Sequence, residues 1–153
     1  MVLMQNIPEL MQKHLTKLEC PTFEAKPWVQ EKPLRQQCVA LVSSAGLHHR
    51  DDRRFAGGET AYREIPGNTA AEDIIMSHVS VSYDRTGFQQ DINTIFPLDR
   101  MRELAEEGFV GSLAETHYSF MGATDPRKME AEARELGSRL KAANVDSVIL
   151  LPV

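Results

Sequence analysis

Residues 144–153 read NVDSVILLPV, and this stretch decides the fold that the sequence predicts. It contains a short apolar run, Val148 to Leu151, in which β-branched residues are frequent, and a helical pattern with a lysine near its end precedes it. Such a run is typical of a central strand of an α/β sheet, buried on both faces. Ligands and catalytic groups of open α/β sheets gather at the carboxyl ends of the strands. The stretch therefore predicts a buried strand with a site at its end.

The rest of the chain supplies further strands and helices for this sheet. A final helix is expected from Asp125-Pro126, with Met129, Leu136 and Leu140 on its apolar face. The patterns before it predict an N-terminal helix over 1–19, a proline-rich connector over 20–37, a strand over 38–46, a polar loop over 47–71, a strand over 76–83, a short extended segment over 91–97, a helix from Leu98 that stops at Gly108, and an irregular or short-strand stretch over 109–122.

This order of elements predicts an α/β fold: a layered, mainly parallel sheet with flanking helices. Three domains of the sequence follow from it, the helix 1–19, the connector 20–37 and an α/β domain over 38–153. The predicted strands are few for such a sheet. We therefore expect the sheet to be incomplete and 38–153 to be the front part of a longer domain.

Composition limits the classes of function. The 153 residues carry a formal net charge of -5, and 42% of them are hydrophobic, as in ordinary soluble domains. Basic residues form no long cluster, so we expect no nucleic-acid partner and no binding to an anionic membrane surface. No apolar run approaches the roughly 18 residues of a membrane-spanning helix. Cys20 and Cys38 have neither metal-site nor disulfide-framework spacing, which favours a reducing, cytoplasmic location.

Common catalytic motifs are missing from the sequence. It contains no Gly-x-Ser-x-Gly elbow, no His-Glu-x-x-His, no Walker loop and no Cys-x-x-Cys, and the glycine pattern of a dinucleotide site does not follow Gly46. Cys38 opens a buried strand, where a thiol usually packs as a small apolar group. We therefore predict no catalytic residue, no metal site and no cofactor from these 153 residues.

Polar residues near the predicted strand ends are the candidates for binding a substrate. Ser44 lies in the small-residue tail of the strand over 38–46, and His48 follows it, either as a ligand for a carboxylate or metal or as part of an exposed loop pair. His78 and His117 have no spacing that relates them, so only the fold could bring them together. Asp91 and Asn93 share one face of an extended segment, where they could hold an ammonium or hydroxyl group or cap the turn before Pro97. The predicted substrate-binding set is therefore Ser44, His48, His78, Asp91, Asn93 and His117.

An ordered set of stretches resembles a known family. The stretches are PWVQEKPL (27–34), VALVSSAGLH (39–48), YREIPGNT (62–69), SHVSVSYD (77–84), DINTIFPLDRMRELAEEGFVGSLAETHYSFMG (91–122) and VDSVILLPV (145–153). Together they resemble the selenoprotein B family of glycine, sarcosine, betaine and D-proline reductases, and the resemblance covers roughly residues 21–153. No single motif carries it, but the ordered set is specific.

The resemblance implies an oxidoreductase subunit for the reductive cleavage of a C–N bond in a small amino-acid-like substrate. It implies partner subunits of a reductase complex, and a reactive selenocysteine or cysteine just after a strand similar to the last one here. Selenolates and thiolates are the nucleophilic forms of these residues. Because UGA encodes selenocysteine, we expect that the chain is the front part of a longer selenoprotein, cut at that codon directly after Val153.

Two other functional classes stay open at this point. The chain could be a non-catalytic binding or assembly module derived from the family, which predicts a stable 17.2 kDa protein. A flavodoxin-like binder of a small molecule, unrelated to reduction, is a weaker alternative. An exposed apolar strand edge would instead favour aggregation or a homo-oligomer.

Overall fold

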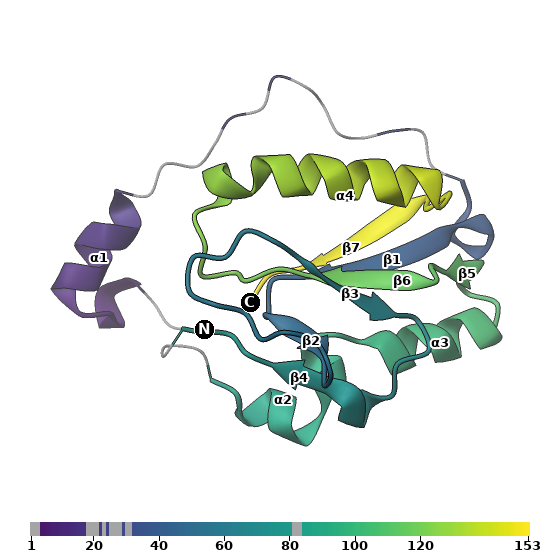
Figure 1. Cartoon of the computed structure of the whole chain (residues 1–153), viewed down its shortest axis with the longest axis horizontal. Coiled ribbons are helices and arrows are strands. Elements are labelled where there is room, and N and C mark those ends of the chain that lie inside the picture. The colour runs from purple at the N-terminus through teal and green to yellow at the C-terminus, as the bar shows by residue number, and fades with distance from the viewer. Residues whose placement is uncertain (1–3, 18–21, 23, 25–28, 30–31, 81–83) are drawn as a thin grey trace. The chain divides into compact units, whose positions relative to one another are not determined.

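The computed structural model describes residues 4–17, 22, 24, 29, 32–80 and 84–153 (Figure 1). The chain divides into two compact units, Met1–Glu31 and Lys32–Val153. The first unit contains a 3₁₀ turn, η1 (Met4–Asn6), and helix α1 (Glu9–Thr16). The carbonyl of Pro8 accepts hydrogen bonds from the Met11 and Gln12 amides at the start of α1. Half of the predicted connector over 20–37 lies outside the described residues, and its last part contains the 3₁₀ turn η2 (Leu34–Gln36).

A mainly parallel sheet forms the centre of the second unit, which confirms the predicted fold class. Strand β1 (Cys38–Ser43) is parallel to β7 (Ser147–Leu151) on one side and to β5 (Ser112–Leu113) and then β6 (Thr116–Ser119) on the other. Strand β3 (Arg63–Pro66) pairs with β6 in the antiparallel direction. Strands β2 (Leu47–His49) and β4 (Ile74–Met76) form a separate antiparallel pair.

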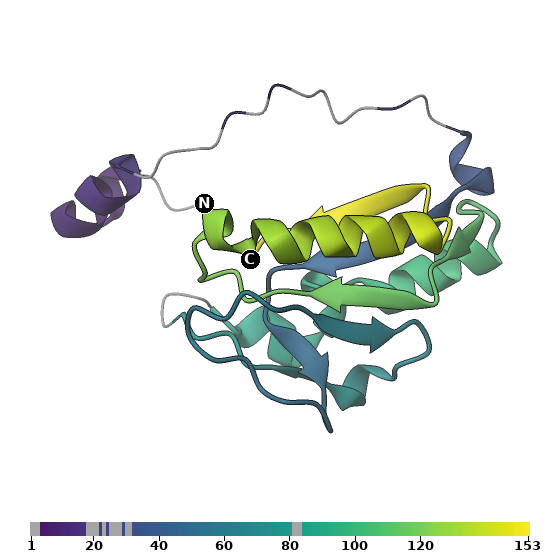
Figure 2. The same ribbon diagram turned by 45° about the horizontal axis from the view of Figure 1, so that its top comes forward.

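Helices cover the two faces of the sheet (Figures 1 and 2). Helix α4 (Glu130–Ala142), which continues from the 3₁₀ turn η5 (Pro126–Met129), packs Leu136 on Tyr118 and Phe120. The opposite face carries the larger core. It is covered by α3 (Leu98–Glu106), α2 (Thr86–Gln90), the 3₁₀ turns η3 (Ala71–Asp73) and η4 (Ile92–Thr94), and the β2–β4 pair.

Several predicted elements are confirmed. Strand β1, helix α3, the final helix and strand β7 all lie where the sequence pattern predicts them. Asp125 accepts a hydrogen bond from the Arg127 amide, and Pro126 opens the first turn of the final helix. Gly108 has a φ of +76°, so it adopts the left-handed conformation expected at a helix stop.

Three predicted segments are wrong in detail. The polar loop over 47–71 contains strands β2 and β3, because buried hydrogen bonds and ion pairs compensate their polar residues. The strand over 76–83 is shifted: β4 ends at Met76, residues 77–80 are not in a strand, and 81–83 lie outside the described residues. The segment over 91–97 is not extended but contains η4, since the Asp91 side chain caps it.

The position of β7 also differs from the expectation of a central strand buried on both faces. Among the described strands, β7 pairs with β1 alone and lies at the edge of the sheet. Leu150 is 71% exposed, because α4 packs over β1 and β6 rather than over β7. In the part of the chain that the structure describes, no helix has the length and apolar character needed to cross a membrane.

Candidate functional site

The carboxyl ends of β1, β6 and β7 meet at one end of the sheet, which we call the carboxyl edge (Figure 1). The sequence predicts the site at this end. Ser43 and Ser119 end β1 and β6, and both side chains are buried. The Ser43 Oγ accepts a hydrogen bond from the Ala45 amide (3.1 Å), and the Ser119 Oγ accepts one from the Leu47 amide (2.9 Å). These two hydroxyls therefore shape the turns at the edge.

Ser44 connects the ends of β1 and β7. Its Oγ accepts a hydrogen bond from the Val153 amide at 2.9 Å and lies 3.5 Å from the Val153 carbonyl oxygen. Its own amide donates to the Leu151 carbonyl at 3.0 Å. The Ser44 side chain therefore holds the backbone at Val153 against the end of β1, and the Ser44 main chain holds the Leu151 carbonyl there.

Gly122 makes room for Ser44 at this edge. The Gly122 amide donates to the Ser44 carbonyl at 2.8 Å. A Cβ atom at residue 122 would lie 2.7 Å from that carbonyl oxygen and 2.9 Å from the Ser44 Cβ. Only glycine fits so close an approach, so Gly122 fixes the loop after β6 against Ser44.

His78 lies beside the same loops. Gly46 has a φ of +65°, and a Cβ there would lie 3.1 Å from the His78 amide nitrogen. The His78 Nδ1 accepts from the Ser80 amide at 3.2 Å, and Arg85 Nη2 donates to the His78 carbonyl at 2.5 Å. Burial of the ring, and then the charge of Arg85, lower the pKa of His78. The structure thus brings a neutral, buried imidazole close to the turn that follows Ser44.

His117 lies deeper, in the core under the sheet. Its Nδ1 accepts from the Leu41 amide at 3.0 Å, and its ring packs edge-on against Phe96 with centroids 6.1 Å apart. Burial, and then the charge of Arg102, lower the pKa of His117 to about 4. Its Nε2 has no hydrogen-bond partner among the described residues. The ring is fully buried, so its neutral form stabilises the interface between β1 and β6.

His48 is buried in β2 rather than exposed in a loop. Its Nδ1 lies 2.7 Å from the His49 carbonyl oxygen, and its ring packs edge-on against Phe55. Since a carbonyl oxygen only accepts, Nδ1 carries the proton and Nε2 has the lone pair. That Nε2 is buried without a hydrogen-bond partner in the described part of the chain. The interpretation of an exposed loop pair is therefore wrong for His48.

Asp91 and Asn93 act as helix caps. The Asp91 carboxylate accepts from the Asn93 amide (2.9 Å) and from the Asn93 side chain (2.8 Å), and these hydrogen bonds lower the pKa of Asp91. The Asn93 Oδ1 in turn accepts from the Asp99 amide at 3.1 Å, at the start of α3. Of the two roles that the sequence left open, the structure contains the capping contacts.

A small cavity lies at the carboxyl edge. Its volume is about 210 Å³, and it is lined by Thr94, Ile95, Leu151, Pro152 and Val153. Sequence reasoning missed these lining residues, because their apolar side chains predict core packing. The position of Pro152 and Val153 directly after a predicted strand was the signal that could have indicated them. The cavity offers apolar walls next to the backbone that Ser44 holds.

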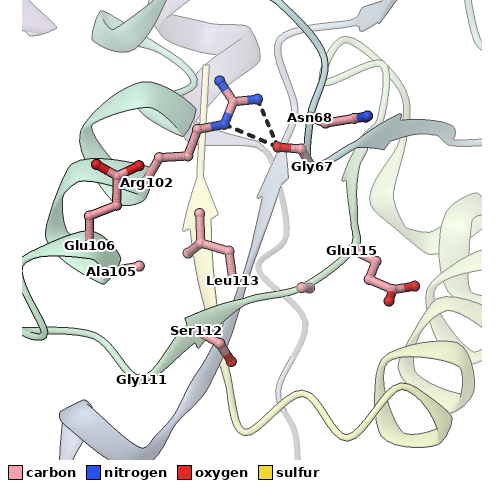
Figure 3. Close-up of a pocket in the computed structure, with 10 residues that line it drawn as sticks. Gly67, Asn68, Arg102, Ala105, Glu106, Gly111, Ser112, Leu113 and Glu115 are labelled. Atoms are coloured by element: carbon pink, nitrogen blue, oxygen red, sulfur yellow. Dashed lines mark hydrogen bonds between the residues drawn. The ribbon is translucent and has the colours of Figure 1, made fainter.

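A larger hollow of about 680 Å³ lies at the opposite, amino edge, between α3 and β5 (Figure 3). Arg102 crosses it, and its guanidinium donates to the carbonyls of Gly67 and Thr69 and to the Asp99 carboxylate. Because these contacts occupy Nε, Nη1 and Nη2, Arg102 acts there as a structural brace. In the described residues, no group of three or more His, Cys, Asp or Glu side chains could hold a metal ion. Because Arg102 is engaged in structural contacts at the amino edge, and because ligand sites of α/β sheets lie at the carboxyl ends of the strands, we take the carboxyl edge as the candidate site.

Comparison with known proteins gives a consistent set of relatives. A family model described as glycine/sarcosine/betaine reductase selenoprotein B matches residues 2–152. The chain is 40% identical, over 78% of its length and 50% of the relative, to the D-proline reductase subunit gamma of Acetoanaerobium sticklandii. It is 30% identical, over 90% of its length and 33% of the relative, to the glycine reductase complex component B subunit gamma of Symbiobacterium thermophilum.

A further relative is the sarcosine reductase complex component B subunit beta of Peptoclostridium acidaminophilum, 31% identical over 91% of the chain and 33% of the relative. No solved structure matches. The chain thus spans half the length of the first of these relatives and a third of the other two. The match of the family model over nearly the whole chain shows that this protein belongs to the glycine/sarcosine/betaine reductase selenoprotein B family.

Proposed function

We propose that the chain builds the carboxyl-edge part of the active site of a reductase B subunit. The reaction is the reductive cleavage of a C–N bond in a small amino-acid-like substrate, with a selenocysteine or cysteine directly beyond Val153 as the nucleophile. In this reaction two electrons and two protons enter the C–N bond, so that carbon gains a hydrogen and nitrogen becomes an amine, which is released unless a ring keeps it attached, as in D-proline. A dithiol of the reductase system supplies the electrons and becomes a disulfide.

The hydrogen bond between the Ser44 hydroxyl and the Val153 amide is the observation that supports this proposal best. The Ser44 Oγ accepts from the Val153 amide at 2.9 Å, and the Ser44 amide donates to the Leu151 carbonyl at 3.0 Å. These two bonds hold the end of β7 and the backbone at Val153 against the end of β1. A residue attached to a backbone held in this way has a defined direction into the crevice at the carboxyl edge. A nucleophile needs such positioning, because small displacements from the productive geometry slow a reaction strongly.

The surroundings of Val153 suit a small substrate. The cavity of about 210 Å³ has apolar walls from Ile95 and Leu151, which can accept the carbon skeleton of an amino acid. His78, whose pKa is lowered by burial, places a neutral, polar imidazole beside the turn that follows Ser44. In this proposal Ser44 and His78 act at the edge, while His48 and His117 support it from the interior. The Asp91 side chain stabilises η4 by capping it at the Asn93 amide, and Thr94 at the end of η4 and the next residue, Ile95, line the cavity.

The names of the relatives also support partner subunits. They describe components and subunits of glycine and sarcosine reductase complexes, and a subunit of D-proline reductase. We propose that this chain works with such subunits in the cytoplasm, where reducing conditions keep Cys38, a free thiol, from oxidation.

Replacing Ser44 by alanine tests the positioning role. Ser44→Ala removes the acceptor of the Val153 amide, so we expect the amine release of the complete reductase to fall about 10- to 100-fold. The free energy of unfolding should fall by only about 1 kcal/mol, because one partly buried hydrogen bond is lost. With a dithiol as reductant, the assay measures the ammonia or amine released from glycine, sarcosine or betaine. For D-proline it measures the new primary amine of the opened chain, because the ring nitrogen stays attached.

Ser138→Ala is the matched control for this experiment. Ser138 is exposed on α4, and its Oγ donates to the Arg134 carbonyl at 3.0 Å, away from the carboxyl edge. This variant should keep full activity. Undiminished activity of Ser44→Ala would contradict the positioning role, and the formation of no amine product from any of the four substrates would contradict the proposed reaction.

A further inference from the structure

The outer side of β7 is an open edge of the sheet. Among the described strands, β7 pairs with β1 alone. The Leu151 carbonyl accepts from the Ser44 amide and therefore points toward β1. Because backbone groups alternate in direction along a strand, the N–H and C=O groups of Val148 and Leu150 point away from β1. The edge thus presents hydrogen-bonding groups for one more strand.

Apolar surface borders this edge on both faces of the sheet. On the side of α4, Val148 is 37% exposed and Leu150 is 71% exposed. On the other side, Leu151 and Val153 line the cavity of about 210 Å³ together with Ile95. An added strand would cover Leu150 on one face and form a further wall of the cavity on the other. Removing apolar surface from water is favourable, so covering this surface favours binding.

The sequence of β7 has none of the features that protect a permanently exposed edge. Solvent-exposed edge strands usually carry charged residues, a bulge or a central proline that prevent pairing. Residues 147–153 contain no charged residue, and the proline, Pro152, comes after the strand. Pro152 lacks an N–H group, so it limits the length of a new ladder without blocking it at Val148 and Leu150. These features indicate that another strand normally covers the edge.

We propose that an extended apolar segment, from the part of the family polypeptide outside the matched region, adds to β7 as the next strand. The D-proline reductase subunit gamma is twice as long as the part that this chain covers, since the match takes 50% of it. Such a relative therefore carries enough further polypeptide to supply a strand. The added strand would be buried on both faces, so it needs a nearly continuous apolar run. The proposal rests on the edge and the family, and it does not depend on the nucleophile.

Amide exchange measured residue by residue by NMR tests this pairing. In the chain alone, the amides of Ile149 and Leu151 should be protected by β1, while those of Val148 and Leu150 should exchange rapidly. The probe is the unmatched half of the D-proline reductase subunit gamma, produced as a separate polypeptide. On its addition, exchange at Val148 and Leu150 should slow by about 100-fold or more. Unchanged exchange at these amides, or protection already present in the monomeric chain, would overturn the proposal.

A charge on the edge provides an independent test. Leu150→Lys places an ammonium group at the new interface, so affinity for the separate polypeptide should fall by at least about 10-fold. Phe109→Lys is the control, because Phe109 is 63% exposed on the loop after α3 and should leave binding unchanged. Both variants replace exposed side chains, and thermal melting checks that they fold.

Sedimentation equilibrium of the chain alone separates this partner from a second copy. If the chain dimerises, and Leu150→Lys abolishes the dimer without weakening binding of the separate polypeptide, the edge is a homodimer interface and the proposal is wrong. Binding that Leu150→Lys weakens, with the chain alone monomeric, supports it. Neither result depends on catalysis, so a failure here is distinct from the loss of amine release that tests the proposed function.

Discussion

Acidification from pH 7 to pH 4 should cost the protein about 3 kcal/mol of unfolding free energy through His117 alone. The folded protein holds this imidazole neutral, with a pKa of about 4, chiefly because the ring is buried. In the unfolded chain its pKa is the ordinary value of about 6.5. Between pH 6.5 and pH 4, His117 is therefore mostly protonated in the unfolded chain and mostly neutral in the folded protein. Stability is lost as the pH falls toward 4, and below that value this side chain causes no further loss.

The variant His117→Gln isolates this contribution. Glutamine does not titrate, and its carbonyl oxygen can still accept from the Leu41 amide. Urea unfolding of both proteins at several pH values gives the difference in free energy, in which the carboxylates that also titrate cancel. The difference should change by about 3 kcal/mol between pH 7 and pH 4. If the glutamine variant fails to fold, an NMR titration of His117 in the unaltered protein serves instead, and a midpoint near 6.5 would contradict the prediction.

Replacing Gly122 by alanine should destabilise the protein by about 1–3 kcal/mol. The added Cβ would lie 2.7 Å from the Ser44 carbonyl oxygen, and backbone cannot rotate away as a flexible side chain can. The loop after β6 must therefore move, and Ser44 moves with it. We expect the amine release of the complete reductase to fall at the same time, because Ser44 holds Val153. Urea unfolding and the amine assay measure the two effects.

Gly137→Ala is the control for Gly122→Ala. Gly137 lies inside α4, and a Cβ there would meet nothing within 4 Å. Alanine has a higher helix propensity than glycine, so this variant should be more stable by about 0.5–1 kcal/mol. The same chemical change thus has opposite signs at the two positions. Equal effects of the two substitutions would contradict the close approach of Gly122 to Ser44.

The elements that sequence reasoning predicted correctly are those with a strong local pattern. β1 is a continuous apolar run, and the final helix combines a cap at Asp125 with apolar residues at helical spacing. Gly108 marks the end of α3 through its left-handed conformation. In each case the residues that specify the element lie within a few positions of one another, so the prediction needs no tertiary contacts.

Polar residues that become buried occur in β3, which the sequence placed in a loop, and in β6, which lies in the stretch expected to be irregular or short strand. In β6, the imidazole of His117 and the hydroxyl of Ser119 accept from the amides of Leu41 and Leu47, which are distant in sequence. In β3, the guanidinium of Arg63 pairs with Glu59 at 2.7 Å. It also lies 4.3 Å from the centre of the Phe55 ring. These partners compensate the cost of burial, and no local pattern shows that they will meet.

The candidate site was partly predictable for the same reason. The small residues after β1 indicated a turn at the carboxyl edge, and Ser44 does lie there. The cavity could not be predicted, because it needs η4 to lie against the end of β7. The spacing of Asp91 and Asn93 allowed either a binding pair or a cap, and the structure contains capping contacts, in which the Asp99 amide at the start of α3 donates to the Asn93 Oδ1.

We propose that the carboxyl edge positions a selenocysteine or cysteine directly beyond Val153. The most direct measurement is the DNA sequence of the source gene through and past codon 153. We predict a UGA codon there, followed by an open reading frame whose apolar pattern continues an α/β domain. A UAA or UAG codon without a continuing frame would contradict the claim, and the chain would then be a binding or assembly module of the family.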